Sequence, residues 1–470
     1  MATTDLIAAI ELSSTKIVGI VGQKMEDGSI NVLAYAPEDA RQFIGKGSIF
    51  NIDKAANALE SVIKQLEAQL NSTIVKVYVG IGGKGMKAVG NDINREIIGQ
   101  DKVSQRLIDD LDEENRNYPI DRMKILDVEP QECDVEGKLV DDPVGVTGQH
   151  ITAHYLNILV REDMHTNLLS SLKQANIEYA DIFTTSRALS GSVLTENELK
   201  GCALVDMGAE TTTVSIFRNK RLRYLMVIPL GGHAITRDLT SLHIDEDEAE
   251  QIKLAFGNVN PDLAESEEEE GKTITLQDGR TVPASQLREI IEARMNEIIA
   301  NVWNLIKRSG CEDKLLQGII ITGGAAAMPG VVEAFKNHSH IEKIRLALST
   351  QLTIQGFNSK LNVGGTSGTL LGILALGNEN CCKPKEKPAE PTPAPIGDGL
   401  FDNDPVLKEQ EEEAKRAKAK READERKQKE KEQKKREREE KKNKTTSWFK
   451  DTFGKLTTEL FSEEAGDDIK

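Results

Sequence analysis

The sequence has little of what marks a secreted or membrane-spanning protein. Its five cysteines are odd in number, and their spacing fits neither a metal site nor a disulfide framework, which is typical of reduced thiols in the cytosol. Nowhere do about eighteen apolar residues run together, so we expect no segment that crosses a bilayer. No basic region precedes the first apolar run, which Asp5 interrupts. We therefore expect no signal peptide and a cytoplasmic protein.

The net charge of −17 is unevenly distributed along the 470 residues. Residues 415–444 contain 16 Lys and Arg against 8 Asp and Glu, a local charge of +8 that leaves −25 on the rest of the chain. An acidic body argues against nucleic acid as its partner.

The chain changes character after about Gly377. Up to that point, strand-like apolar runs alternate with helical periodicities, which indicates an α/β body. Residues 383–405 are rich in Pro, Lys, Glu and Asp, which is typical of a solvated linker. Residues 408–444 are nearly all Glu, Lys, Arg, Ala and Gln, so a single solvent-exposed helix and a disordered chain both remain open.

One segment occurs twice, as residues 7–18 and 203–214. In each copy an apolar strand ends at an acidic residue, a small and hydroxyl-rich turn comes next, and a second apolar strand leaves. The acidic residues, Glu11 and Asp206, lie 195 positions apart, which suits two similar domains facing one another.

Each copy of this hairpin is suited to a phosphate. Small residues let backbone amides approach the anion, hydroxyls donate to its oxygens, and the acidic group can hold Mg²⁺ through water. An ordinary turn is the alternative for either copy alone, and the matching acids favour phosphate. A third segment, residues 318–330, predicts a strand, the double glycine Gly323–Gly324 and a Pro-Gly start of a helix, and glycine there lets the chain lie flat against adenine.

These three segments, in this order, resemble the actin, hexokinase and heat-shock-chaperone superfamily, and within it the FtsA family of bacterial cell-division proteins. The resemblance covers about residues 5–377, including Ser192–Glu198, Ile228–Asp238 and Asp247–Lys253. It implies an actin-like α/β fold of two facing ribonuclease-H-like domains, with an inserted α+β subdomain and a C-terminal linker plus amphipathic helix. The implied parts are subdomain 1A (1–84 and 163–200, completed by 366–380), inserted subdomain 1C (85–162), subdomain 2A (201–242 and 305–365), subdomain 2B (243–304), a charged linker (381–444) and a membrane-targeting helix (445–463).

By the same resemblance, ATP with Mg²⁺ binds between the two domains. The residues implied for nucleotide binding are Glu11, Ser13, Ser14, Thr15, Lys16, Asp206, Gly208, Ala209, Glu210, Thr211, Thr212, Glu250, Lys253, Gly323 and Gly324. Glu11 and Asp206 would hold the metal through water. Glu250 and Lys253 would bracket the ribose and base, although an exposed i,i+3 ion pair is the alternative.

Both phosphate turns depart from the family pattern. The first has Glu11-Leu12-Ser13 where Asp-x-Gly is usual, and the second has Ala209-Glu210 where two glycines are usual. A Cβ restricts positive φ, and the Glu210 carboxylate lies near the expected terminal phosphate, which it repels. We therefore expect binding to survive more surely than hydrolysis, and the catalytic residue stays unassigned.

Two further motifs carry little weight. Residues 80–85 satisfy G-x-G-x-x-G after a strand, but residues 86–91 have no helical periodicity, so a dinucleotide site is not expected. His338 and His340 have no nearby cysteine or carboxylate partner, which is more typical of surface residues than of a metal site.

The last residues predict an amphipathic helix. Its apolar side chains fall within an arc of about 140° on a helix; they are Trp448, Phe449, Phe453, Leu456 and Leu460. Such a helix lies in the membrane interface rather than crossing it, and assembly of many copies would make its weak binding firm. Docking of this helix on a protein groove is the alternative.

The FtsA resemblance implies a scaffold that self-assembles at the division site, on the cytoplasmic side of the inner membrane. Its implied partners are the C-terminal tail of the tubulin-like protein FtsZ, further copies of itself, anionic lipids and other division proteins. Candidate FtsZ contacts are Arg280, Arg288 and Arg294, although each is equally typical of ordinary surface. An actin-superfamily phosphotransferase and a pilus-assembly-type ATPase remain alternatives.

Overall fold

The computed structural model describes residues 5–97, 102–260, 272–356 and 367–384. Contacts divide the chain into residues 1–386 and residues 387–470, and every described residue belongs to the first unit. The predicted membrane helix lies outside the described residues, as do most of the charged linker and the side chains of Trp448, Phe449, Phe453, Leu456 and Leu460.

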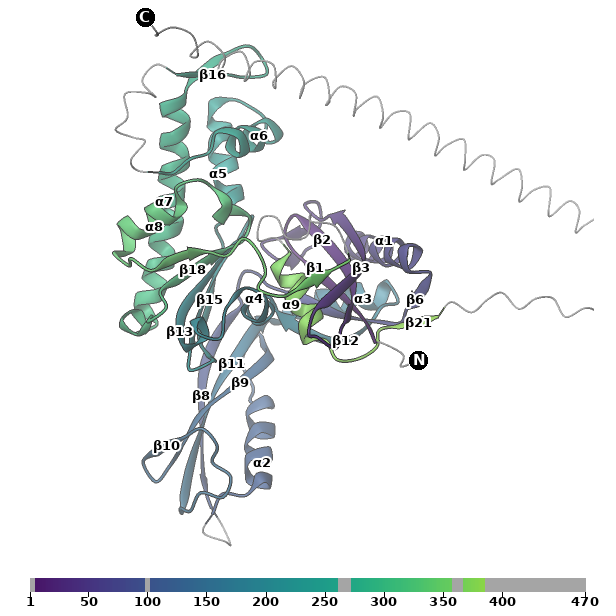
Figure 1. The fold of residues 1–470 in the computed structure, drawn as a ribbon, viewed down its shortest axis with the longest axis vertical. Coiled ribbons are helices and arrows are strands. Elements are labelled where there is room, and N and C mark those ends of the chain that lie inside the picture. Colours follow the sequence, from purple (N-terminus) through teal and green to yellow (C-terminus); the bar gives the residue numbers. More distant parts are fainter. Residues whose placement is uncertain (1–4, 98–101, 261–271, 357–366, 385–470) are drawn as a thin grey trace, which may run out of the picture. The chain divides into compact units, whose positions relative to one another are not determined.

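The first sheet has the strand order β12-β7-β1-β2-β3-β20; its strands β1, β2, β3 and β12 are labelled in Figure 1. The strands are β1 (Leu6–Leu12), β2 (Lys16–Lys24), β3 (Ile30–Asp39), β7 (Lys76–Ile81), β12 (Glu178–Thr184) and β20 (Ile354–Gln355). Strands β12, β7 and β1 run parallel, and β1, β2 and β3 form an antiparallel meander.

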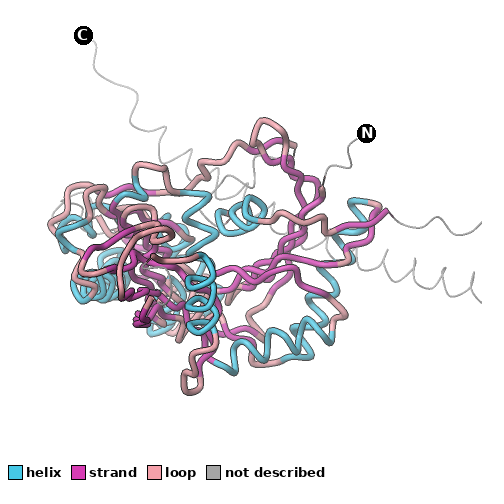
Figure 2. Tube along the Cα trace, turned by 90° about the horizontal axis from the view of Figure 1, so that it is seen from below, coloured by secondary structure: helices cyan, strands magenta, loops and turns pink. Residues whose placement is uncertain are grey.

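Helices cover both faces of this sheet (Figure 2). They are α1 (Ile52–Leu70), α3 (Glu162–Gln174), α4 (Thr185–Val193) and α9 (Gly368–Leu376). Gly19 leaves room for Val62 of α1, and Gly22, on the opposite face of β2, leaves room for Leu374 of α9. The close approach of both helices explains glycine at these two strand positions.

The second sheet has the order β10-β9-β11-β8-β15-β14-β13-β18-β19. The strands are β8 (Lys87–Glu96), β9 (Met123–Val135), β10 (Lys138–Val140), β11 (His150–Arg161), β13 (Gly201–Met207), β14 (Thr212–Arg218), β15 (Arg221–Ile228), β18 (Ile319–Thr322) and β19 (Ile344–Leu346). Its part β19-β18-β13-β14-β15 repeats the arrangement β12-β7-β1-β2-β3, with two parallel pairings followed by an antiparallel meander. This duplication confirms the expected actin-like fold of two ribonuclease-H-like domains.

The second domain buries one long helix against its sheet. Its helices are α5 (Gly232–Leu239), α6 (Glu246–Phe256), α7 (Ala284–Arg308) and α8 (Val331–Ser339), and a small hairpin joins β16 (Thr273–Thr275) to β17 (Thr281–Pro283). The buried side chains of α7 include Leu287, Ile291, Met295, Ile298 and Val302, an apolar stripe at helical spacing. Among the helices that the structure describes, none is both long and apolar enough to cross a membrane.

The inserted region has a small core of its own. Strands β8 to β11 and α2 (Gln105–Arg116) bury Ile93, Leu111, Ile151 and Tyr155 together. The helix of this region, α2, is acidic, and residues 138–154 contain β10 and the start of β11. Strand β8 also pairs with β15 at a single register position, so the sheet of the insert is continuous with that of the second domain.

The body extends further along the chain than expected. Its remaining elements are β4 (Ile44–Gly45), β5 (Ser48–Ile49), β6 (Ser72–Ile74), β21 (Cys382–Pro384) and the 3₁₀ turns η1 (Glu198–Lys200), η2 (Thr240–Leu242), η5 (Glu312–Lys314) and η6 (Gly324–Ala327). Strand β21 pairs with β6, and Cys381 and Cys382 are buried. The resemblance implied a charged linker from residue 381, whereas in the structure the chain stays packed through Pro384.

Residues 378–384, here called the terminal strap, are held at several points. The Tyr78 hydroxyl donates to Asn378 Oδ1 (2.9 Å) and accepts from the amides of Asn378 (3.1 Å) and Glu379 (3.0 Å). The Cys381 amide donates to the Leu6 carbonyl at 2.7 Å. The strap is thus fixed to the first domain.

Candidate functional site

The two duplicated hairpins place their turns on a cleft of about 790 Å³. Residues 14–16 line it from the first domain, and residues 208–210 line it from the second. Glu11 pairs with Gly80 of β7, and Asp206 pairs with Thr322 of β18, so each acid lies near the carboxyl end of its central strand. The two segments that repeat in the sequence therefore also occupy equivalent positions in their two sheets.

Fourteen of the fifteen residues predicted for nucleotide binding line this cleft or a cavity of about 170 Å³ formed by the same turns. They are Glu11, Ser13, Ser14, Thr15, Lys16, Asp206, Gly208, Ala209, Glu210, Thr211, Glu250, Lys253, Gly323 and Gly324. The exception is Thr212, which is fully buried and donates its hydroxyl to the Leu230 carbonyl at 2.8 Å. Its neighbour Thr213 lines the smaller cavity instead and pairs with Asp206.

The two acids at the base of the cleft hold their protons unusually tightly. Burial raises the pKa of Glu11 to about 7, with a further contribution from Asp206 that Lys16 and a hydrogen bond with Thr369 partly offset. Burial raises the pKa of Asp206 to about 6. A cation between these carboxyls would relieve their repulsion.

Carboxylate oxygens are suitable ligands for Mg²⁺. Within the described part of the chain, however, no group of three or more His, Cys, Asp or Glu side chains is placed to hold a metal ion. Any Mg²⁺ here would depend on waters and phosphate oxygens as well as on the two acids.

Two hydroxyl groups of the first turn form hydrogen bonds within the protein. Ser13 Oγ donates to the Lys16 carbonyl at 2.9 Å, which closes the turn. Ser14 Oγ accepts from the amide of Gly47 at 3.0 Å. Gly47 belongs to the β4–β5 hairpin, which sequence reasoning did not connect to the site because its contribution comes from backbone amides.

The Glu250–Lys253 pair is formed but is not an exposed ion pair. Lys253 Nζ lies 2.7 Å from Glu250 Oε2, 2.9 Å from Thr236 Oγ1 and 3.1 Å from the Gly232 carbonyl, so its three donors are all used. Burial alone would raise the pKa of Glu250, but the hydrogen bonds from Lys253 and Thr236 hold it below its usual value. Lys253 therefore positions an ionised Glu250 at the edge of the cleft.

Gly323 cannot carry a side chain in this structure. Its φ is +95°, and an added Cβ would lie 2.4 Å from the Met207 carbonyl oxygen and 2.6 Å from Asp206 Oδ1. The following turn η6, together with Met328 and Pro329, lines the cleft. The double glycine thus lets the backbone of η6 approach the carboxyl end of β13.

Comparison with known proteins assigns the chain to a family. The family model described as "Cell division protein FtsA" matches residues 203–363. Curated proteins of that name from Porphyromonas gingivalis and Bacillus subtilis are each 30% identical to this chain, over 339 and 344 residues. The first alignment covers 70% of both chains, and the second covers 71% of this chain and 76% of the relative. The chain belongs to the FtsA family.

It is therefore an actin-like cell-division protein. The FtsA protein of Escherichia coli K12 is 25% identical over 387 residues, which cover 80% of this chain and 91% of that relative. Among solved structures, the PilM–PilN type IV pilus biogenesis complex matches with a TM-score of 0.54 at 13% identity, over 79% of this chain and 97% of that chain. At this identity the likeness concerns the fold alone.

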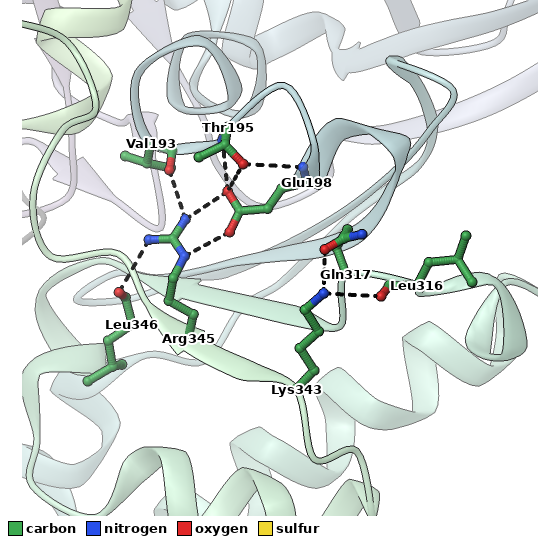
Figure 3. A network of polar contacts seen from close by, with 8 residues as sticks. All are labelled: Val193, Thr195, Glu198, Leu316, Gln317, Lys343, Arg345 and Leu346. Atoms are coloured by element: carbon green, nitrogen blue, oxygen red, sulfur yellow. Dashed lines mark hydrogen bonds and ion pairs between the residues drawn. The ribbon is translucent and has the colours of Figure 1, made fainter.

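A segment that carried the FtsA resemblance, Ser192–Glu198, forms the connection from α4 to the second domain. Figure 3 shows how Arg345 of β19 binds it: Nε and Nη2 lie 2.8 and 3.0 Å from the two oxygens of Glu198, and Nη2 also donates to the Val193 carbonyl at 3.0 Å. Thr195 donates its amide to Glu198 Oε2 at 2.7 Å. We call this set of contacts the hinge clamp.

The mouth of the cleft is lined by charged residues that sequence reasoning missed. Arg41 forms a two-pronged pair with Asp39, and Asp247 and Glu246 of α6 act on it electrostatically from the second domain. His233 Nε2 lies 2.8 Å from Glu246 Oε1. Arg41 and Asp39 lie at the end of β3, where no motif marks them.

The remaining sequence candidates have other places in this FtsA-family body. Residues 80–85 lead into strand β8, in agreement with the lack of helical periodicity in the residues after them. His338 and His340 lie at the end of α8. The candidate FtsZ contacts already have acidic partners, Asp278 for Arg280, Glu292 for Arg288, and Asp238 and Glu297 for Arg294.

Proposed function

We propose that this chain is an ATP-binding scaffold that self-assembles into filaments on the cytoplasmic face of the inner membrane at the division site. There it anchors the FtsZ ring by binding the FtsZ C-terminal tail, and it helps to recruit other division proteins. The nucleotide part rests on one observation: two duplicated hairpins line the same cleft, each with an acid at the end of its first strand. Membership of the FtsA family supports the rest.

The residues present fit a nucleotide that arrives with Mg²⁺. A volume of about 790 Å³ is ample, since ligand pockets commonly measure about 300–1,000 Å³. The smaller cavity is lined by Glu11, Asp206 and Glu210 as well as by the cation Lys16, so its acids, where ionised, would repel a bare phosphate chain. MgATP would bind to residues of both domains and link them, and its release would break that link.

Different residues of the chain would bind different parts of that ligand. Glu11 and Asp206 would hold the metal through water, and small residues of the two turns would bring backbone amides to the phosphates. Glu250, fixed by Lys253, would accept hydrogen bonds from the ribose. The backbone at Gly323 would lie against the base.

We infer that the nucleotide acts mainly on conformation. The Ser13 hydroxyl donates its proton to the Lys16 carbonyl rather than to a ligand, and Glu210 brings a carboxylate into the space between the turns. Each feature weakens the support for charge that develops on a leaving phosphate. Slow or absent hydrolysis is therefore the expected property.

Membrane attachment would come from residues 445–463, which lie outside the described part of the chain. Their apolar arc predicts reversible binding at a lipid surface, and the basic stretch at 415–444 would add attraction to anionic headgroups. Self-assembly would convert many weak contacts into firm attachment.

Gly323→Ala tests the nucleotide site. The added Cβ would meet Met207 and Asp206, so we expect at least a tenfold loss of affinity for a fluorescent ATP analogue in the presence of Mg²⁺. Gly279→Ala is the matched control, because Gly279 also has a positive φ (+85°) but nothing lies within 4 Å of its Cβ position. Wild-type affinity in a folded Gly323→Ala protein would place the nucleotide elsewhere.

Sedimentation with lipid vesicles tests the membrane role. The full chain should pellet with anionic vesicles, and a chain that ends at residue 444 should remain in the supernatant. If the truncated chain pellets equally well, the terminal helix is not the tether. Capture of the full chain by an FtsZ C-terminal peptide would then separate the division scaffold from the pilus-assembly alternative.

A further inference from the structure

We propose that Glu210 is a built-in competitor for the terminal phosphate of a nucleoside triphosphate, and that it does this by bonding across the cleft to the amide of Lys46. This inference rests on the proposed nucleotide site. It makes Glu210 a residue that sets the preference between nucleoside diphosphate and triphosphate.

The contact crosses the cleft. Glu210 lies in the β13–β14 turn of the second domain, and its Oε2 accepts a hydrogen bond of 2.5 Å from the backbone amide of Lys46. Lys46 lies at the tip of the β4–β5 hairpin of the first domain. A single carboxylate therefore joins the two walls that a phosphate chain would otherwise join.

The hairpin tip is built to receive an anion. Lys46 and Gly47 have φ values of +50° and +79°, the two positive values of a tight two-residue turn, and successive backbone amides of this kind form anion-binding hollows. The Gly47 amide is also aimed inward, at Ser14 Oγ. The tip is held firmly, because a Cβ on Gly47 would lie 2.0 Å from the Gly82 carbonyl oxygen.

The side chain of Glu210 is not needed to make its own turn. The backbone closes that turn through the Gly208 amide, which donates to the Thr211 carbonyl at 2.9 Å. Glu210 is not among the non-glycine residues with positive φ, so alanine fits its backbone without strain. What the carboxylate contributes is therefore the contact with Lys46 and a negative charge.

The negative charge of Glu210 would act on the terminal phosphate of a nucleoside triphosphate. The smaller cavity already contains Glu11 and Asp206, which a Mg²⁺ ion would offset, whereas Glu210 has taken a backbone amide as its partner. A further phosphate must displace this carboxylate and remain beside it, so the triphosphate loses more affinity than the diphosphate. The free protein, in turn, keeps a link across its cleft without any nucleotide.

Two variants of Glu210 separate the effect of its hydrogen bond from that of its charge, and a third variant serves as the control. Glu210→Ala removes both, and Glu210→Gln keeps an oxygen acceptor but removes the charge. Glu136→Ala is the matched control, because the Glu136 carboxylate also accepts backbone amides, from Gln149 at 2.7 Å and His150 at 2.9 Å, but in the inserted region. Circular dichroism and thermal unfolding would check that each variant is folded.

The first measurement is the ratio of ATP to ADP affinity, by equilibrium titration with Mg²⁺. We expect Glu210→Ala and Glu210→Gln to raise this ratio about tenfold over wild type, and Glu136→Ala to leave it unchanged. The second measurement is hydrogen exchange of the Lys46 amide without nucleotide. Protection should be lost in Glu210→Ala and largely kept in Glu210→Gln.

The outcomes are distinguishable. If wild type binds both nucleotides and the ratio stays within twofold in Glu210→Ala, the competitor role is overturned while the proposed nucleotide site stands. If no protein binds either nucleotide, the proposed site fails and the competitor role fails with it. Unchanged protection of Lys46 in Glu210→Ala would overturn the contact itself.

Discussion

Glu11 and Asp206 share the base of the cleft, and their raised pKa values make the free protein sensitive to pH. The pKa of Glu11 is about 7 in the folded state against an ordinary value of 4.5. Between these two values the folded protein keeps a proton that the unfolded chain releases, so the free energy of unfolding falls as the pH rises from 4.5 to 7. Above pH 7, Glu11 is ionised in both the folded and the unfolded state, and the full decrease in the free energy of unfolding remains.

Glu11→Gln removes this penalty. We expect the variant to be more stable than wild type at pH 8, by up to about 3 kcal/mol, and to show no such advantage at pH 4.5. Urea unfolding of the nucleotide-free proteins across this pH range measures the difference. Glu60→Gln, on the exposed surface of α1, provides the comparison. Parallel pH profiles for wild type and Glu11→Gln would contradict the argument.

Residue patterns predicted side chains of the site better than its backbone. The acids were visible because each ends an apolar strand in a repeated segment. Thr213 rather than Thr212 pairs with Asp206, because side chains alternate along β14. The run of three threonines at 211–213 does not itself show which of them faces the cleft. Lys46 and Gly47 act through their amides, and nothing in their side chains signals that.

At the scale of elements, the hinge clamp joins β19 to the connection between the two domains. Glu198 is largely buried, and its hydrogen bonds with Arg345 and Thr195 lower its pKa against the opposing effect of burial. Arg345→Ala leaves that carboxylate without its main partner, so we expect a loss of roughly 1–3 kcal/mol in urea unfolding.

Lys343→Ala serves as the control for this prediction. Lys343 directly precedes β19, and its ammonium group donates to the Leu316 carbonyl and to the Gln317 side chain (Figure 3). Its loss should cost less than about 0.5 kcal/mol. Arg345→Lys should recover little, because lysine cannot form the two-pronged contact. Equal costs for Arg345→Ala and Lys343→Ala would show that the clamp does not matter.

The arrangement of elements was only partly accessible from the sequence. The duplicated hairpins and the insert were expected, and the insert has its own small core. That its sheet joins the second domain was not, because the connection depends on one register pair between β8 and β15 and on Arg223 of β15 binding Glu132 of β9. The register pair joins Lys87 to Met226, 139 positions apart, and the second contact spans 91 positions, so neither leaves a local pattern.

For the whole molecule, the terminal strap decides where the body ends. Composition placed the solvated linker from residue 383, and the family resemblance placed it from residue 381, yet two buried cysteines and a pairing strand keep the chain on the body through Pro384. A chain that ends at residue 384 should therefore unfold like the intact body. One that ends at Gly377 should lose at least about 2 kcal/mol, through lost burial and lost hydrogen bonds with Tyr78 and Leu6.

Thermal unfolding of the two shortened proteins measures this difference. In the protein that ends at residue 384, thiol reactivity gives a second check, since burial raises the pKa of Cys382 to about 12 and this thiol should react slowly while the strap stays packed. If both shortened proteins melt together, the strap contributes nothing to stability.

The terminal strap also determines how a mechanical load would enter the protein. Tension on the chain beyond Pro384 would fall first on the hydrogen bonds between β21 and β6, and then on the contact of Cys381 with Leu6. All of these belong to the first domain. The second domain contacts it elsewhere, at the α4 connection and the hinge clamp among other places, and lies outside this line of force. A tethered molecule would thus bear strain in one half while the other remained free to respond to the contents of the cleft.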